Sequence, residues 1–389
     1  MHIQEYVETN NLTFDKAPFN NVDAAVLCAL FYGRIENVIE GENDCDARRG
    51  VPVREFYKQE YFPGMFSDGI TDQENKALLT TAAASPRFRD IKVYNVEVKD
   101  DANSDMQFAA ATFSIDDNTD FVCFRGTDGT IHGWKEDFDM VFMDEVPSQG
   151  EAVDYLNRHY DIADSGELCQ SLYVAGHSKG GNLAIYSSTM CADTVKGLIK
   201  TVYSFDGPGF KEDVLAALED EWKKSPLDIK KFMPRDSMIG TIMSDNQDAL
   251  VVKSDALLIL QHSLYTWELE DNDFVYADNR SGLSEIFDDA LSEWIHGASA
   301  AQRRTFVDVL FSVFSENELD TVNDLKSVKP ADIRKILSSI KDVPEEDHEV
   351  MSELLSALLR SVVHTNHTHV RANVVNFMGN FGLDSPEDV

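Results

Sequence analysis

The chain has 389 residues, of which 43% are hydrophobic and 10% aromatic, so it can bury a large core and differs from an intrinsically disordered protein. Its 69 Asp and Glu residues outnumber its 34 Lys and Arg residues, which gives a formal net charge of −35. Such a surface repels the phosphates of nucleic acids and anionic lipid headgroups, which excludes both as expected partners.

The N-terminal residues lack the basic and apolar regions of a secretory signal, and no apolar run reaches the length of a membrane span. The five cysteines are odd in number and widely spaced, and they contain no C-x-x-C pair. We therefore expect a reducing, cytoplasmic setting, no membrane insertion and buried free thiols at Cys28, Cys123 and Cys191.

The first ninety or so residues combine helices with irregular segments. Pro18 and Asn20 precede a helical apolar stripe over residues 21–38 and predict its start. Three strand-like runs follow at residues 91–98, 106–115 and 120–126, separated by short polar turns. This spacing predicts an antiparallel meander.

After residue 126 the pattern changes to alternating helices and strands, which predicts an α/β fold whose parallel sheet is covered by helices on both faces. The expected helices lie near 132–142, near 151–162, from 179 onward and at 211–222; the expected strands lie at 172–175, 201–207 and 228–234; two further apolar runs occupy 249–254 and 256–262.

Beyond Ser281 the apolar spacing is helical to the end of the chain. We expect two parts: a domain over residues 1–280 and a helical C-terminal appendage over 281–389. The appendage could be a lid, a cap or a partner-binding module.

Residues 176–180 read GHSKG and fit the pattern G-x-S-x-G between a short apolar strand and a helix. In that context the serine sits on a sharp strand-to-helix turn, a nucleophile elbow, with its hydroxyl at the sheet edge. The N-terminus of the following helix points its N–H groups at the same place, which suits a developing oxyanion. Ser178 is the predicted nucleophile.

A serine nucleophile needs a base and an acid that orients the base. Among the histidines after Ser178, only His262 follows a strand-like run within the α/β part, so it is the predicted base. Two acids compete: Asp206 ends the strand after the nucleophile's helix, and Asp236 follows the next strand. Spacing favours Asp236, because Asp206 precedes a glycine and could simply shape a turn. The oxyanion donors are expected at Lys179 and at Thr127, in the glycine-containing loop after the strand 120–126.

The segments FRGTDGTIHGWKEDFD, VAGHSKGGNLA, TVYSFDGPGF, MPRDSMIG and LQHSLYTW together resemble α/β-hydrolases related to class 3 (fungal-type) lipases. The closer resemblance is to a bacterial lipase-like family of unknown function, whose PFN-x-VDA opening is matched by APFNNVDAAVL. The resemblance covers residues 12–270. It implies an α/β-hydrolase fold with a mostly parallel sheet, a triad of Ser178, Asp236 and His262, an oxyanion hole at Thr127 and Lys179, and a lid-like segment after residues 134–139.

Three classes of function remain open at this stage. The leading hypothesis is a cofactor-free serine hydrolase that cleaves carboxylic esters, and a thioesterase or acyltransferase would use the same residues. Because residues 140–152 are acidic where lipases carry an apolar lid, a small soluble ester or thioester is as plausible a substrate as a lipid. The second hypothesis is a catalytically silent scaffold that works through its acidic helical tail. A metal site at His364, His367 and His369 is disfavoured, because their spacing does not bring all three to one helical face. The oligomeric state stays open.

Overall fold

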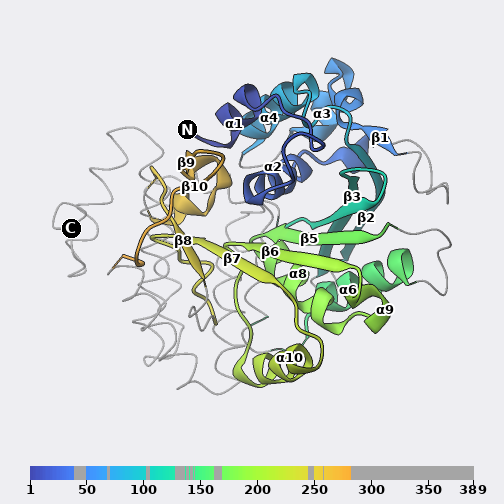
Figure 1. Cartoon of the computed structure of the whole chain (residues 1–389), viewed down its shortest axis with the longest axis vertical. Helices are drawn as coiled ribbons and strands as arrows, with labels where there is room; N and C mark the ends of the chain where they lie inside the picture. Colours follow the sequence, from blue (N-terminus) through green and yellow to red (C-terminus); the bar gives the residue numbers. More distant parts are fainter. Residues whose placement is uncertain are drawn as a thin grey trace, which may run out of the picture.

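An eight-stranded sheet crosses the protein, and its strands lie side by side in the order in which they occur in the chain (Figure 1). The computed structural model describes residues 1–38, 50–67, 71–101, 106–127, 136, 140, 143, 145–161, 169–243, 249–256 and 258–281. The predicted helices beyond residue 281 and the three-histidine cluster lie outside these residues, as does most of the predicted helix 132–142. Of the acidic lid-like segment 140–152, only residues 141, 142 and 144 lie outside them, and residues 147–152 are helical.

The first half of the sheet is antiparallel and the second half is parallel. The antiparallel strands are β1 (Val51–Pro52), β2 (Lys92–Asp101), β3 (Met106–Ser114) and β4 (Thr119–Phe124). The strands that continue the sheet in parallel from β4 are β5 (Ser171–His177), β6 (Ile199–Phe205), β7 (Ile229–Pro234) and β8 (Leu250–Val252). The predicted meander and the predicted parallel sheet are therefore both confirmed.

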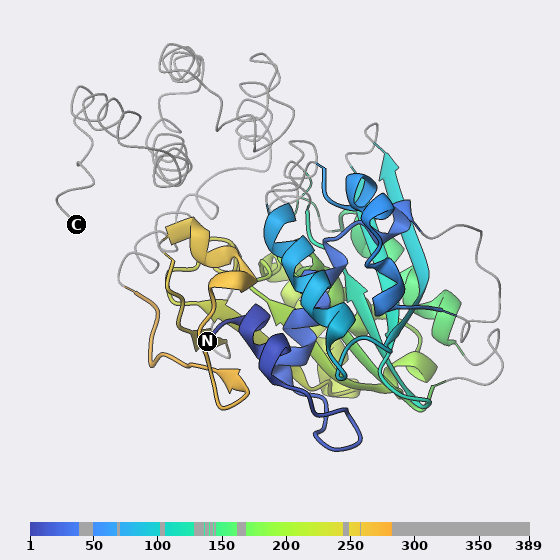
Figure 2. The ribbon, with the colours of Figure 1, turned by 90° about the horizontal axis from the view of Figure 1, so that it is seen from above.

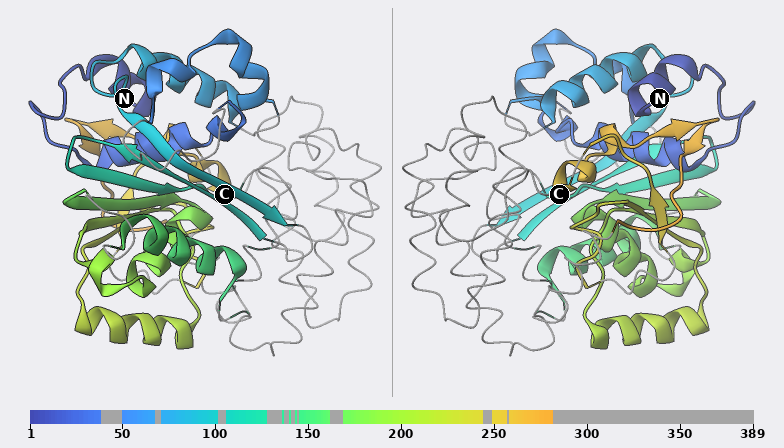
Figure 3. Two further views of the ribbon diagram at one scale, coloured as in Figure 1. Left: turned by 90° about the vertical axis from the view of Figure 1, so that its right-hand side faces the viewer. Right: turned by 90° about the vertical axis from the view of Figure 1, so that its left-hand side faces the viewer.

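Helices cover both faces of the sheet, so the fold has three layers (Figures 1 and 3). One layer contains α1 (Ile3–Thr9), α2 (Asn21–Phe31), α3 (Phe62–Met65) and α4 (Asp72–Ala84). The opposite layer contains α6 (Pro147–Tyr160), α8 (Lys179–Met190), α9 (Asp193–Lys196) and α10 (Glu212–Lys224). This arrangement confirms an α/β fold.

Two hydrophobic cores lie on the two faces of the sheet. On β4, Phe121 and Cys123 belong to the core beneath α2, whereas Val122 and Phe124 belong to the core beneath α6 and α8. This division follows from the alternation of side chains along a strand. All four residues are fully buried, as expected for a central strand covered on both faces.

Short 3-10 helices connect the layers: η1 (Ile35–Asn37), η3 (Val53–Phe56), η4 (Gln59–Tyr61), η5 (Leu258–His262) and η6 (Leu264–Thr266). The apolar run at 256–262, interpreted as strand-like, contains η5 instead. The predicted helix 21–38 ends at Phe31 and is followed by a turn and η1. None of the helices in the described ranges is both long and apolar enough for a membrane span.

A small hairpin of β9 (Leu269–Glu270) and β10 (Asp273–Phe274) lies beside the start of the chain (Figure 2). The backbone N–H of Leu269 donates to the carbonyl oxygen of Met1 at 2.9 Å, and the Met1 amino group donates back to the Leu269 carbonyl oxygen at 3.2 Å. The segment that follows His262 is thereby fixed to the helical layer around α1.

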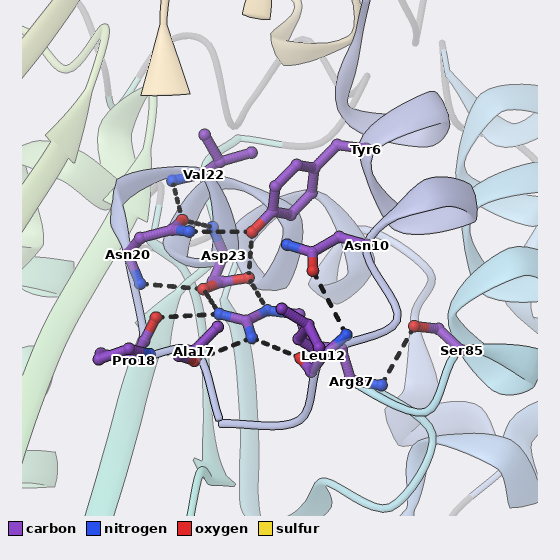
Figure 4. Close-up of polar contacts among 10 residues, drawn as sticks. All are labelled: Tyr6, Asn10, Leu12, Ala17, Pro18, Asn20, Val22, Asp23, Ser85 and Arg87. Carbon is purple, nitrogen blue, oxygen red and sulfur yellow. Dashed lines mark hydrogen bonds and ion pairs between the residues drawn. The ribbon is translucent and has the colours of Figure 1, made fainter. Parts of the chain in front are cut away.

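The PFN-x-VDA segment contains Asp23, which forms a buried ion pair with Arg87 (Figure 4). Asn20 caps α2 in a capping box with Asp23, and the Asp23 carboxylate accepts from Arg87 Nε at 2.7 Å and from the Tyr6 hydroxyl at 2.9 Å. The remaining guanidinium N–H groups of Arg87 donate to Asp23 and to three carbonyl oxygens, those of Leu12, Ala17 and Pro18. All five donors of the guanidinium are satisfied, so this segment has a structural role.

Candidate active site

Ser178 occupies a strained turn between β5 and α8. Its backbone angles are φ 59° and ψ −134°, a combination that non-glycine residues rarely adopt. The turn is held by the N–H of Ser178, which donates to the carbonyl oxygen of Phe205 on the neighbouring strand at 2.9 Å. This geometry is the one expected for the nucleophile elbow.

Two glycines make the turn sterically possible. A Cβ atom on Gly176 would lie less than 3.0 Å from backbone atoms of Gly180. A Cβ atom on Gly180 would likewise lie less than 3.0 Å from the backbone of Phe124 on β4. Because backbone cannot move aside as a flexible side chain can, the first and last positions of G-x-S-x-G require glycine here.

The carboxylate beside His262 belongs to Asp206. His262 Nδ1 lies 2.6 Å from Asp206 Oδ2, and the Asp206 side chain is fully buried. The other carboxylate oxygen accepts hydrogen bonds from the Ser237 hydroxyl and, at 3.2 Å, from the N–H of Gly240. Asp206 follows β6 directly and has a positive φ of 49°. The same residue therefore shapes the turn after β6 and contacts His262.

The expected contact of Asp236 with His262 is wrong in this geometry. Its Oδ2 accepts from the side-chain amide of Gln261 at 2.7 Å, and its N–H donates to the Gln261 Oε1 at 2.9 Å. Asp236 therefore fixes the residue before His262. The reason is the loop after β7, which turns Ser237 and Gly240 towards Asp206 and leaves Asp236 facing η5.

His262 keeps one ring nitrogen for chemistry. Because its Nδ1 faces a carboxylate, that nitrogen carries the proton, and Nε2 is the nitrogen that can accept one. The side chain is 21% exposed, in contrast to the enclosed carboxylate behind it. The ring also packs against that of His177, the residue before Ser178, with 4.4 Å between centroids and a tilt of 35°. This contact brings His262 to the elbow.

The loop after β4 lies against the elbow. Phe124 and Gly176 are register partners in the parallel pair β4–β5, so residues 125–127 leave the sheet next to Ser178. A Cβ atom on Gly126 would lie 2.9 Å from the Cβ of Ser178, which shows how closely this loop packs. Thr127 is the last residue described before residue 136.

Lys179 offers only its backbone to this site. It is the first residue of α8, so its N–H lies at the N-terminus of that helix. Its side chain is buried and its ammonium donates to Glu136 Oε2 at 2.7 Å and to the Gln107 carbonyl oxygen at 2.9 Å. Glu136 also accepts from the N–H groups of Gln107 and Ser148, at 3.0 and 3.2 Å. The positive charge of Lys179 is therefore neutralised inside the protein.

A family model described as Mbeg1-like matches residues 82–312, a span that includes Ser178, Asp206 and His262 and more than half of the chain. The chain belongs to the Mbeg1-like family. This is a lipase-like family, which confirms the lipase-like part of the resemblance seen in the sequence, while a bacterial origin stays a prediction.

Several solved lipase structures are similar to this Mbeg1-like chain at low identity. The native Rhizomucor miehei lipase propeptide complex is 14% identical over 55% of this chain and 77% of its own, with a TM-score of 0.34. A fungal lipase–inhibitor complex is 14% identical over 60% and 88%, with a TM-score of 0.33, and M37 lipase is 13% identical over 65% and 82%, with a TM-score of 0.30. A comparison with curated proteins finds no match.

Sequence reasoning missed three residues around the elbow of this Mbeg1-like chain: Tyr32, Glu136 and His177. Each acts across a long sequence separation, which no local pattern reveals. The position of Asp206, in contrast, carried a usable signal. The strand that it ends is the next one after the nucleophile's strand, and the carboxyl ends of neighbouring parallel strands meet at one edge of the sheet.

Proposed function

We propose that this protein is a serine hydrolase that cleaves carboxylic esters through an acyl-enzyme, with Ser178 as nucleophile, His262 as base and Asp206 as the orienting acid. Two observations carry the proposal: the 2.6 Å contact between His262 and a buried carboxylate, and a strained serine elbow whose preceding residue, His177, contacts the ring of His262. A strained serine with an oriented imidazole beside it is the arrangement that activates a hydroxyl.

In the proposed reaction, His262 Nε2 takes the proton of the Ser178 hydroxyl as its oxygen attacks the ester carbonyl carbon. The resulting oxyanion accepts hydrogen bonds from the backbone N–H groups of Lys179 and Thr127. The tetrahedral intermediate collapses as His262 returns the proton to the leaving alcohol. Water then hydrolyses the acyl-enzyme by the same steps, and Asp206 stabilises the imidazolium each time it forms.

We also propose that the substrate is a small, soluble ester or thioester and that the protein works in the cytoplasm. Four cysteines, Cys28, Cys123, Cys169 and Cys191, are buried free thiols, which suits a reducing compartment. The ammonium of Lys179 is taken up by Glu136, so this residue supplies no charge for an anionic substrate.

The test is labelling of the full chain with a fluorophosphonate, followed by hydrolysis assays on an ester and thioester chain-length series. We expect the wild-type protein to be labelled at Ser178, and Ser178→Ala and His262→Ala to lose labelling. Turnover should fall about 10⁶-fold in either variant, because the nucleophile and base act as a unit. A folded wild-type protein that stays unlabelled would contradict the proposal and favour a scaffold role.

A further inference from the structure

His177 is held at both of its ring nitrogens. Its Nε2 lies 2.7 Å from the carbonyl oxygen of His262, and since a carbonyl oxygen only accepts, Nε2 carries the proton. The other nitrogen, Nδ1, then accepts from the hydroxyl of Tyr32 at 2.9 Å. With both nitrogens occupied and a residue exposure of 8%, His177 cannot serve as a second base for Ser178.

The carbonyl that His177 binds belongs to the end of a helix. His262 is the last residue of η5, and the last carbonyl groups of a helix have no donor within it. Two side chains donate to these last carbonyl oxygens. The indole N–H of Trp267 donates to the Gln261 carbonyl oxygen at 2.7 Å, and His177 Nε2 donates to the His262 carbonyl oxygen. The backbone that carries the base is thus fixed from outside η5.

Tyr32 connects this contact to the helical layer above the sheet. It is the C-cap residue of α2, and its ring meets that of His177 edge-on with 5.7 Å between centroids. A Cβ atom on Gly126 would lie less than 3.0 Å from the Tyr32 hydroxyl, the His177 carbonyl oxygen and Ser178 Cβ. Tyr32, His177 and the loop of residues 125–127 therefore pack as one unit around Ser178.

We propose that His177, oriented by Tyr32, is a positioning residue that holds the main chain of His262 against the elbow, while Asp206 holds its ring. This inference rests on the proposed hydrolase function. The two contacts are independent, because His177 binds the backbone carbonyl oxygen of His262, whereas Asp206 binds its Nδ1. His177 acts through His262 and does not touch the reacting atoms.

Neutrality of His177 is part of this arrangement. Burial, and in second place the neighbouring His262, lower the pKa of His177 well below its ordinary value. A neutral ring at 4.4 Å does not oppose the positive charge that His262 acquires during each proton transfer.

The experiment compares His177→Asn with His177→Gln, because the amide nitrogen of Gln reaches the place of Nε2 whereas that of Asn reaches only the place of Nδ1. Two readouts are needed: the rate constant of fluorophosphonate labelling, and the downfield proton NMR signal of the His262–Asp206 hydrogen bond. We expect His177→Asn to slow labelling about 10- to 100-fold, as misplacement of a catalytic group does, and to shift or broaden the signal. His177→Gln should stay close to wild type in both.

Labelling at the wild-type rate with an unchanged signal in His177→Asn would overturn the proposal. Equal losses in both variants with an unchanged signal would also overturn it, because they would indicate packing alone. Should His177→Asn fail to fold, Tyr32→Phe removes only the orienting hydroxyl: slower labelling and a shifted signal support the proposal, and wild-type values overturn it. Failure of the hydrolase function would look different, since the wild-type protein would then stay unlabelled while the NMR comparison still decides the positioning role.

Discussion

Asp23 and Asp206 are both fully buried carboxylates with several hydrogen-bond donors, but their partners differ. Asp23 faces Arg87, a permanent cation whose side chain is also fully buried. Asp206 faces the imidazole of His262, whose side chain is 21% exposed. A closed pair with a fixed charge stabilises the fold, whereas a pair whose imidazole reaches the surface can take part in a reaction.

The comparison predicts a large loss of activity for Asp206→Asn. The amide cannot stabilise the imidazolium and favours the wrong tautomer of His262, so kcat for ester hydrolysis should fall about 10⁴-fold. The melting temperature should change little, because the amide still fills the same space. Hydrolysis of a chromogenic ester and a thermal melt measure the two quantities; a kcat within tenfold of wild type would contradict the assignment of the acid.

The opposite result is expected for Arg87→Met. This change leaves the Asp23 carboxylate buried without its cation and should lower the free energy of unfolding by about 3–5 kcal/mol. The folded fraction should still label at Ser178, because Arg87 does not reach the elbow. Urea denaturation measures the loss.

The matched control for Arg87→Met is Arg54→Met, since the Arg54 side chain is 45% exposed and pairs with Asp90 at the surface. It should cost less than about 1 kcal/mol. Similar losses of unfolding free energy in both variants would show that the buried pair stabilises the fold no more than the surface pair does.

A smaller effect is expected from Gly240→Ala. A Cβ atom at this position would lie less than 3.0 Å from Asp206 Oδ1, so the carboxylate must shift from its place beside His262. We expect kcat to fall about 10- to 100-fold with KM nearly unchanged. Gly64→Ala is the control, because its Cβ would meet its nearest neighbour at an ordinary 3.6 Å. Equal kinetics in the two variants would show that the position of Asp206 tolerates displacement.

The smallest effect concerns pH. The pKa of His177 is lowered in the folded protein, so the unfolded chain binds the extra proton first as pH falls below the ordinary value of 6.5. His177 therefore leaves stability unaffected above that value and reduces it below, by at most about 1.4 kcal/mol per pH unit. His177→Gln should flatten this dependence between pH 5 and 7 in urea denaturation. Parallel curves for the two proteins would contradict a neutral, buried His177.

The sequence predicted the elements around the site well and the contacts between them less well. The meander, the parallel strands and the elbow at Ser178 follow from local periodicity and from G-x-S-x-G, which depend on neighbours in the chain. The choice of acid depends on how the loop after β7 folds, and its residues Ser237 and Gly240 gave no sign that they bind Asp206. The strand-like run before His262 forms η5, and the carbonyl oxygens at its end accept from His177 and Trp267. Both donors lie outside the run, so its local pattern did not reveal them.

The most direct test of the central claim is the ratio of fluorophosphonate labelling rates of Asp206→Asn and Asp236→Asn, measured side by side on folded protein. Asp236 contacts Gln261 and is not in contact with the ring of His262, so its variant should label close to the wild-type rate. Asp206→Asn should label about 10³- to 10⁴-fold more slowly. The reverse order would return the acid to Asp236 and contradict the geometry, and equal rates would show that neither carboxylate activates Ser178.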